Sequence, residues 1–352
     1  MTKVDLLKRS WPLLVLAVVL VLINLGQAEA AQAGEDTAGP SWVHWIERFF
    51  VILTGGVVAF GIVQVEFEFL HWAWGKIWPP GNPVEDLASI SSVQETILPV
   101  SEVRRFDVHL RIQHFLLLTS FIVLALTGIA QKFYRSTPFD DLLVFVGGLS
   151  GLRAIHRVAG FVLILDGLYH MVYLIPGLVT MRSGVPMVRV GRWIEMIPNL
   201  RDVQDFFHMM GYFLGVSPHP PRFGHFSYLQ KFDYWAVWWG LVIMAASGIV
   251  ILLPIMGMDV TGTAIIAAAL VAHSDEAILA ISWIIIVHLF HAHLAPRAFP
   301  FNTSIFTSIF TGNISVAHLK EEHPLEFAQL VEEWKSRPSE AQPYRVSPPP
   351  GP

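Results

Sequence analysis

Residues 155–179, IHRVAGFVLILDGLYHMVYLIPGLV, form an apolar stretch that is long enough to cross a bilayer and carries two histidines. His156 and His170 lie 14 residues apart, which is about 21 Å along a helix axis. Fourteen residues turn an α-helix through about 1400°, so the two side chains lie on nearly the same face. Histidine is costly in hydrocarbon and is usually placed there for a function. The stretch therefore predicts a membrane helix with one functional imidazole near each end.

A second apolar stretch, residues 261–294, repeats this pattern. His273 and His288 lie 15 residues apart in it, which is about 22 Å along a helix axis. Two stacked histidines on each of two membrane helices suit the axial ligands of two b-type haems, one near each surface of the bilayer. A single intramembrane histidine more often bonds a neighbouring helix or lines a polar cavity, and this alternative stays open for each histidine taken alone.

The composition agrees with a membrane protein and narrows the redox chemistry. Hydrophobic residues make up 53% of the chain and charged residues 14%, whereas soluble domains carry about 25% charged residues. The net charge of −5 argues against a nucleic-acid partner. The chain has no cysteine, which excludes covalent c-type haem attachment, cysteine-bound iron–sulfur clusters, thiolate zinc sites and disulfides. Any redox centre must therefore be held by histidine or by a partner subunit.

Apolar runs of membrane length recur along the chain, at residues 49–65, 115–130, 155–179, 234–253 and 261–294. The last run exceeds the roughly 20 residues of a perpendicular span, so we expect it to project beyond the membrane near residues 274–276 or to break there. These runs predict an all-α integral membrane protein. We expect a transmembrane bundle with a four-helix haem-binding core and one or two N-terminal helices.

The N-terminal segment, residues 1–33, has a basic start, an apolar run and small-x-small exits. These features describe either a cleaved secretory signal or a retained first helix, and both remain open. Residues 34–106 then hold an extra membrane helix and a soluble linker. Residues 107–296 form the haem core, and residues 297–352 form a proline-rich tail.

The orientation of the bundle follows from loop charge. The long connection 181–232 is rich in arginine and lysine, whereas the loop 254–272 has neither. The positive-inside rule places the long connection in the cytoplasm, together with the C-terminal tail. The predicted location is therefore the inner membrane of a bacterium, with several membrane passes.

The same topology sets the depth of each histidine. His156 and His273 share the periplasmic level, and His114, His170 and His288 share the cytoplasmic level. Each level can supply two axial imidazoles to one porphyrin iron, so all five histidines are candidate haem ligands. Three candidates meet at the cytoplasmic level, where two are needed.

Small and basic residues lie where haem would need space and charge. Gly128 falls at the periplasmic haem level, and Gly160 lies one turn after His156 on its face; ordinary helix packing explains either glycine equally well. Haem propionates need cations, and we expect Arg111, Arg153 and Arg157 to supply them. Membrane anchoring explains these arginines almost as well.

A quinone site needs a hydrogen-bonding group near a haem and a path for protons to water. The cytoplasmic level offers His170, Asp233, His291 and His293, among which Asp233 and His293 are the candidate quinone residues. Asp166, in mid-span, suits proton transfer or a bond to a neighbouring helix. We expect the remaining histidines to be solvated, in loops or at interfaces: His44, His71, His109, His208, His219, His225, His318 and His323.

Several motifs resemble a known family. In chain order they are DVHLRIQH at 107–114, LTG at 126–128, IHRVAG at 155–160, HSDEA at 273–277, His288-x-x-x-x-His293, Phe299-Pro300 and GNIS at 312–315. Over residues 107–326 the chain resembles the dihaem cytochrome b membrane subunits of the formate dehydrogenase gamma, thiosulfate reductase and nickel–iron hydrogenase type. The resemblance implies that His114 pairs with His288 and that His156 pairs with His273. The departures are His170, the 181–232 insertion and the N-terminal helix with its linker, and His170 leaves the cytoplasmic ligand pair open.

The resemblance also implies a function. We expect a membrane-embedded dihaem cytochrome b of a respiratory chain that transfers electrons across the bilayer, as one subunit of a quinone-linked oxidoreductase. The expected substrate is a quinone or menaquinone, and the expected partner is a periplasmic iron–sulfur, molybdenum or nickel–iron subunit, or a multihaem cytochrome c. Two alternatives are a proton-coupled transporter that uses intramembrane histidine and aspartate, and a structural membrane anchor of a redox complex.

Overall fold

The computed structural model describes residues 41–77, 100–134, 139–180, 194–258, 263–294 and 302–335. The predicted signal or first helix at 1–33 and most of the predicted linker lie outside these ranges. The chain divides into two compact units, each described by itself below. The first comprises Met1–Val65, Gln113–His170 and Trp235–Leu294, and the second comprises Glu66–Ile112, Met171–Tyr234 and Ala295–Pro352.

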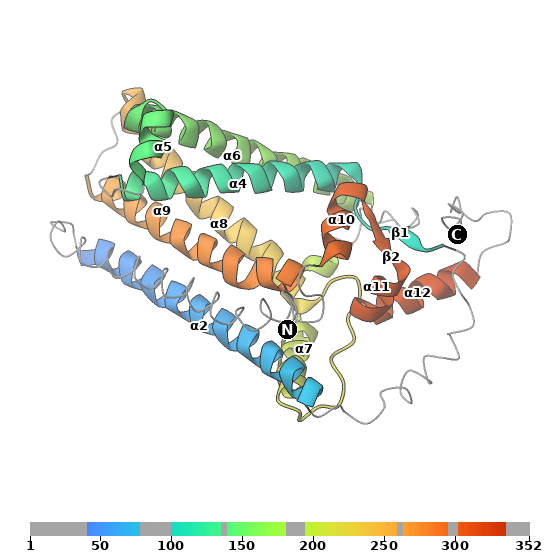
Figure 1. The fold of residues 1–352 in the computed structure, drawn as a ribbon. Coiled ribbons are helices and arrows are strands. Elements are labelled where there is room, and N and C mark those ends of the chain that lie inside the picture. The colour runs from blue at the N-terminus through green and yellow to red at the C-terminus, as the bar shows by residue number, and fades with distance from the viewer. Residues whose placement is uncertain are drawn as a thin grey trace. The chain divides into compact units, whose positions relative to one another are not determined.

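The long helices coincide with the apolar runs. They are α2 (Ser41–Ile77), α4 (Val108–Lys132), α6 (Gly148–Thr180), α8 (Tyr228–Leu252) and α9 (Thr263–Trp283), with α9 extended by the π-helical segments Ile284–His288 and Phe290–Leu294. Five spans in the described chain are long and apolar enough to cross a membrane, and each covers all or most of one of the predicted runs. The predicted all-α membrane bundle is therefore confirmed (Figure 1).

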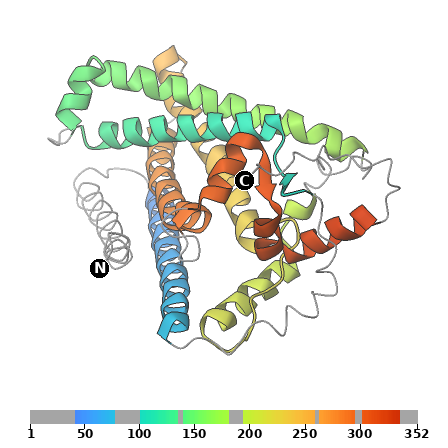
Figure 2. The ribbon, with the colours of Figure 1, turned by 45° about the vertical axis from the view of Figure 1, so that its right-hand side comes forward.

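Four of these helices form a closed ring in the first unit. On one side of the ring, α4 packs against α6 through Leu124 and Gly160, and the two helices lie side by side in Figures 1 and 2. Helix α6 meets α8 where Gly167 lies against Leu241. Small residues at such contacts let the helix backbones approach closely in an apolar medium, where hydrophobic burial gives no driving force for association.

The ring closes through α9 and carries one helix outside it. Gly240 of α8 lies against the carboxyl group of Glu276 of α9, and the Nζ of Lys132 at the end of α4 donates to Ser274 at 3.1 Å. Helix α2 packs on the outside of α9, where Gly61 contacts Ile286. The haem-binding core predicted for four helices therefore corresponds to α4, α6, α8 and α9, with α2 as an addition.

Helix α9 corrects one sequence-based expectation. It runs without a break through residues 274–276, where we expected a break as one alternative. The polar side chains there find partners on neighbouring helices: Lys132 donates to Ser274, and the Nε1 of Trp239 donates to Glu276 at 3.2 Å. The helix departs from α geometry further on, in the two π-helical segments.

The second unit contains the short elements. Helix α7 (Leu200–Phe213) lies in the connection between α6 and α8, and α10 (Thr303–Thr311), α11 (Val316–Glu322) and α12 (Pro324–Lys335) follow α9. Strand β1 (Glu102–Arg104) pairs antiparallel with β2 (Asn313–Ser315), so that Val103 lies opposite Ile314. Two shorter helical pieces, α5 (Asp140–Phe145) and a 3₁₀ turn at Leu253–Met256, belong to the loops of the first unit.

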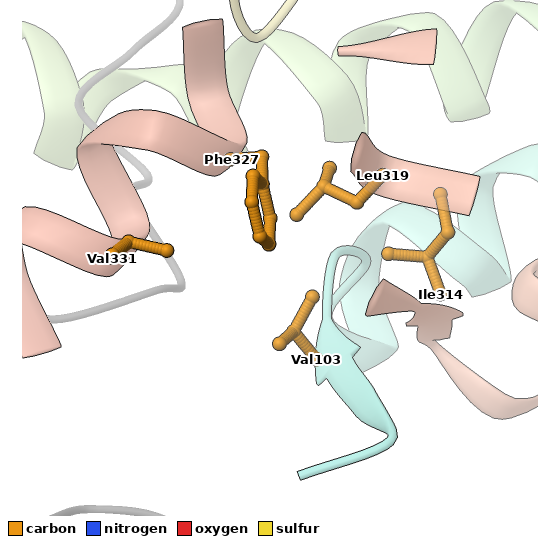
Figure 3. Packing of buried hydrophobic residues seen from close by; sticks show 5 residues of the cluster. All are labelled: Val103, Ile314, Leu319, Phe327 and Val331. Atoms are coloured by element: carbon orange, nitrogen blue, oxygen red, sulfur yellow. The ribbon is translucent and has the colours of Figure 1, made fainter. Parts of the chain in front are cut away.

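A small hydrophobic core joins the strands to the C-terminal helices. Its buried members are Val103, Ile314, Leu319, Phe327 and Val331, which converge from β1, β2, α11 and α12 (Figure 3). The segment just before the first core helix and the segment after the last one thus fold together, although they are more than 200 residues apart in the chain.

An ionic cluster fixes the same region and corrects the expectation that His225 and His323 are solvated. His323 is 4% exposed, and its Nδ1 bonds the carbonyl of Gly224 at 2.7 Å. The carboxylate of Glu326 forms an ion pair with Arg105 at 2.6 Å and also bonds the ring of His225. Sequence patterns miss this burial because the partners come from three separate segments.

Candidate haem site

His156 of α6 and His273 of α9 face each other inside the ring of helices. Their ring centroids are 6.2 Å apart. Two imidazoles on one iron, with metal–nitrogen bonds of about 2 Å and a ring radius of about 1 Å, place their centroids about 6 Å apart. The two side chains that the sequence assigns to the periplasmic level are therefore spaced as axial ligands of one haem.

Hydroxyl groups on α4 and α8 bond the Nδ1 atoms of the two rings. The Oγ1 of Thr127 lies 2.8 Å from the Nδ1 of His156, and the Oγ of Ser247 lies 3.0 Å from the Nδ1 of His273. Each hydroxyl also donates its own proton to the carbonyl four residues earlier in its helix, at 2.6 Å in both cases. Because that proton is committed, each hydroxyl accepts from an Nδ1–H.

This hydrogen-bond pattern assigns the tautomer of both histidines. With the proton on Nδ1, the Nε2 of each ring keeps a free lone pair, which is the form that ligates a metal. Histidine ligands nearly always donate their second N–H to a neighbouring acceptor, which fixes the ring and raises its basicity. The pair thus has both the spacing and the tautomer that haem ligation needs.

Two glycines make room for the rings. A Cβ added to Gly128 would lie 3.4 Å from the Cε1 of His156, and one added to Gly248 would lie 3.2 Å from the Cε1 of His273. Gly128 therefore serves the histidine at the predicted level. Gly160 has a different place, because only Leu124 lies near its Cβ position, and it serves helix packing.

The segments of α4 and α8 that contact the two histidine rings share a sequence pattern. Residues 125–129 read ALTGI and residues 245–249 read AASGI. In each, a hydroxyl residue and the next glycine contact one histidine of the following helix. Sequence reasoning noted Gly128 but missed Thr127, Ser247 and Gly248, although this short internal repeat was available to reveal them.

Buried carboxyl groups lie along the same helices. Glu276, one turn after His273, is 2% exposed and accepts from Trp239. Asp275 is bonded by Ser274 and lies within electrostatic reach of Lys132. Asp166 is also buried, and its Oδ1 has no hydrogen-bond partner among the described residues.

At the other level, the structure gathers three imidazoles. His114 interacts electrostatically with His288 and His293, so the first-helix histidine lies near both histidines at the end of α9. The Nδ1 of His114 is buried and has no hydrogen-bond partner among the described residues. This grouping brings together His114 and His288, the pair that the family resemblance implies, with His293 beside them.

The π-helical turn before His288 affects which face this residue occupies. In a regular α-helix the 15 residues from His273 end about 60° past a whole number of turns. A π turn accommodates an extra residue, so it brings His288 back toward the face of His273. The Nδ1 of His291 bonds the carbonyl of Val287 at 2.8 Å within the same segment.

His170 has a different environment from His114. Its Nδ1 lies 2.7 Å from the Oε1 of Gln113, and its ring lies 5.8 Å from that of Trp238. It therefore lies where α6 meets α4 and α8. The topology predicted from the sequence assigns it to the same cytoplasmic level as His114 and His288. An imidazole with one nitrogen fixed by an amide suits either haem ligation or contact with a bound quinone.

The remaining candidates are placed as follows. The Nε of Arg111 donates to the carbonyl of Ile309 at 3.1 Å. Arg153 and Arg157 are exposed on α6. Asp233 and His293 are half-buried, in the first turns of α8 and at the end of α9. Their predicted roles toward propionates and quinone remain predictions.

Comparison with known proteins supplies one result. A family model described as prokaryotic cytochrome b561 matches residues 105–311, which is more than half of the chain. No curated protein matches the chain. The matched region begins just before α4 and ends with α10, so it contains the four-helix ring and all five candidate haem-ligand histidines.

Proposed function

Because this chain belongs to the prokaryotic cytochrome b561 family, it is a multi-pass membrane protein of haem b electron transfer, and we propose that it holds two haems and connects a quinone pool to a periplasmic redox partner. His156 and His273 hold one haem in this proposal, and His114 and His288 hold the other. The chain acts in a bacterial inner membrane as the cytochrome subunit of a larger oxidoreductase.

One observation carries the proposal. The rings of His156 and His273 stand 6.2 Å apart with both Nδ1 atoms bound to hydroxyl groups of neighbouring helices. A transporter would need polar groups along a path, and an anchor would need only the spans. Neither function accounts for two imidazoles at this distance that each have the Nδ1 bonded to a hydroxyl group.

The residues of the chain have three tasks in this function. The helix spacing of about 21–22 Å between histidine levels sets the distance over which electrons cross the membrane. The Thr127 and Ser247 hydroxyls hold the ring orientation and protonation of the periplasmic pair. Bound haem supplies a reversible one-electron carrier, whose potential depends on axial ligands and burial.

Quinone chemistry belongs to the cytoplasmic level in this proposal. Reduction or oxidation of a quinone moves protons as well as electrons, so its site needs titratable groups with access to water. His170, His293 and Asp233 are half-buried there. We assign His170 and His293 to the quinone and keep His114 and His288 as iron ligands, since His114 lies with His288.

A spectroscopic experiment with inhibitors tests the proposal. The purified protein should show the reduced-minus-oxidised α-band of b-type haem, and a quinone-analogue inhibitor should shift the band or potential of one haem only. His170→Ala should retain two haems and weaken the inhibitor response by about tenfold, as expected for loss of one hydrogen bond to a bound ligand. His219→Ala, in the exposed 216–220 segment, is the control.

The outcome separates the alternatives. A protein without haem would contradict the cytochrome function and favour a transporter or an anchor. Loss of a haem in His170→Ala, with His114→Ala spectrally normal, would move the ligand role to His170. An inhibitor response confined to the haem of His156 and His273 would place the quinone at the periplasmic level, near Asp275 and Glu276.

A further inference from the structure

Helix α7 (Leu200–Phe213) carries an apolar stripe that the rest of the described chain leaves exposed. Leu200, Val203, Phe207 and the C-cap residue Leu214 are 80%, 53%, 66% and 59% exposed. At 100° per residue these four positions fall within a sector of about 60°. The stripe is therefore one narrow, continuous face of the helix.

The helix has a well-defined start. Asn199 accepts from the backbone N–H of Arg201, and Asp202 accepts from the backbone N–H of Asn199, which together make a capping box. The capping box therefore fixes the residue at which the helix begins.

The opposite side of α7 is held to the protein at both ends. Near its start, the buried Asp202 forms an ion pair with the buried Lys231 in the first turn of α8, at 2.8 Å. Near its end, the ring of Tyr212 lies 4.3 Å from that of His71 on α2. Phe206, between these points, lies 5.9 Å from Tyr228, the first residue of α8.

A third side of the helix is polar and open to solvent. Arg201, Gln204 and His208 are exposed and lie next to one another on the helix surface. Helix α7 therefore has three faces along its length: one toward the protein, one apolar and uncovered, and one polar and uncovered. This division is typical of a helix that lies in the plane of a membrane surface.

The attachment points define where the helix lies. Lys231 is in the first turns of the membrane span Tyr228–Met256, and His71 is in the last turns of the span Trp42–Gly75. These are the ends that the loop charges predict on the cytoplasmic side. A helix tied to both span ends runs along the membrane surface, where the stripe can enter lipid.

We propose that α7 is an interfacial helix that inserts Leu200, Val203, Phe207 and Leu214 into the cytoplasmic leaflet. Apolar residues just before and just after the helix extend the inserted surface, since Ile197 is 44% and Val216 is 81% exposed. Arg201 and Arg222 are exposed and match the negative charge of anionic headgroups. The proposal does not depend on the haem assignment.

The chain has no cysteine, so single cysteines can report on each face. Val203→Cys and Phe207→Cys probe the stripe, and Gln204→Cys and His208→Cys are matched controls on the polar face. Each variant carries a nitroxide label in nanodiscs of phosphatidylglycerol and phosphatidylcholine. Power saturation then compares the accessibility of the label to oxygen, which partitions into lipid, and to a water-soluble nickel chelate.

The expected result is a ratio of oxygen to nickel accessibility several-fold higher at positions 203 and 207 than at 204 and 208. Equal and high nickel accessibility at all four positions would overturn the proposal, because the stripe would then face water. Shielding of positions 203 and 207 from both reagents would also overturn it and would indicate a protein surface over the stripe. The haem content of each variant, measured separately, distinguishes these outcomes from a failure of the cytochrome function.

Discussion

At the scale of single residues, the site is defined by hydrogen bonds to two rings. Thr127 and Ser247 each accept a hydrogen bond from the Nδ1–H of one histidine and donate a hydrogen bond to a carbonyl of their own helix. The bond to the carbonyl removes the alternative in which the hydroxyl donates to the ring. Two short side chains thus decide which nitrogen of His156 and of His273 carries the ring proton and which one keeps its lone pair.

Removing either hydroxyl should weaken haem binding at this level. Thr127→Val keeps the shape of the side chain and leaves the Nδ1–H of His156 without its hydroxyl acceptor. Ser247→Ala removes the hydroxyl acceptor of His273, whose ring also bonds the backbone of Met244, so we expect the smaller effect there. Loss of such a partner costs about 10–100-fold in metal affinity. We expect lower occupancy of one haem and a lower stability of its ligated state, measured by haem-to-protein ratio during purification and by redox titration.

Two further variants act as controls for this prediction. Thr127→Ser restores the hydroxyl and should restore both readouts. Thr119→Val, at an exposed position of the same helix with the same bond to a carbonyl four residues earlier, should behave as wild type. Unchanged occupancy and potential in both Thr127→Val and Ser247→Ala would mean that the hydroxyls do not set the ligands.

The histidines were predictable from sequence, and their supporting residues were not. A histidine in an apolar run is conspicuous because its cost in hydrocarbon is high. Threonine and serine are common in membrane helices, where their hydroxyls bond their own backbone, so position alone does not mark Thr127 or Ser247. Only the pairing of α4 with α6 and of α8 with α9 shows that their hydroxyls meet rings.

At the scale of elements, neighbouring segments decide what local patterns leave open. At the polar residues 274–276 we expected the last span to project beyond the membrane or to break, but α9 continues without a break, and Ser274 and Glu276 find partners in Lys132 and Trp239 on adjacent helices. Conversely, no local pattern marked the π turns at its end. Periodicity predicts that a helix exists and does not report the bonds that reach it from other segments.

The ionic cluster at the C-terminal helices has its own acid sensitivity. Burial and the nearby charge of Arg105 lower the pKa of His323 to about 3. Burial alone would raise the pKa of Glu326, but the hydrogen bond from His225 and the charge of Arg105 outweigh it and lower this pKa to about 2. Both groups therefore bind protons less readily in the folded cluster than in the unfolded chain.

Folding of this cluster should weaken in acid. The contribution of His323 is complete above its ordinary pKa of 6.5 and falls as the pH drops toward about 3, and that of Glu326 falls between 4.5 and about 2. We expect hydrogen exchange in α11 and α12, corrected for intrinsic rates, to be faster at pH 5 than at pH 7.5. Equal protection at both pH values would contradict the linkage.

Removing the carboxylate tests the same cluster by mutation. Glu326→Gln leaves the buried Arg105 without its charge partner, which costs about 3–5 kcal/mol when a buried pair is broken. Exchange in α12 should then be faster already at pH 7.5 and should rise further at pH 5, because His323 still loses its contribution there. The control Glu321→Gln removes an exposed carboxylate of α11 and should leave protection unchanged.

At the scale of the whole molecule, the number and type of spans were predictable, and their neighbours were not. Hydropathy is a property of each segment, so five runs sufficed to predict five membrane helices. Which helices touch depends on glycines such as Gly61 and Gly167, whose partners lie far away in sequence. Depth could be predicted before contacts because alternating topology alone assigns each histidine to a level.

The family match adds a division of the chain to this picture. Residues 105–311 carry the ring of helices, whereas α2 precedes the matched region and α11 and α12 follow it. Helix α2 contacts α9 within the first unit, and α11 and α12 share a small core with β1 within the second.

Haem stoichiometry tests the central claim most directly. Pyridine-haemochrome analysis of the purified chain should give two haems b per polypeptide, and His156→Ala and His273→Ala should each give one, because each removes an axial ligand of the same iron. His318→Ala, outside the spans, should keep two. Two haems with unchanged spectra in both ligand variants, or no haem in the wild-type chain, would contradict the account.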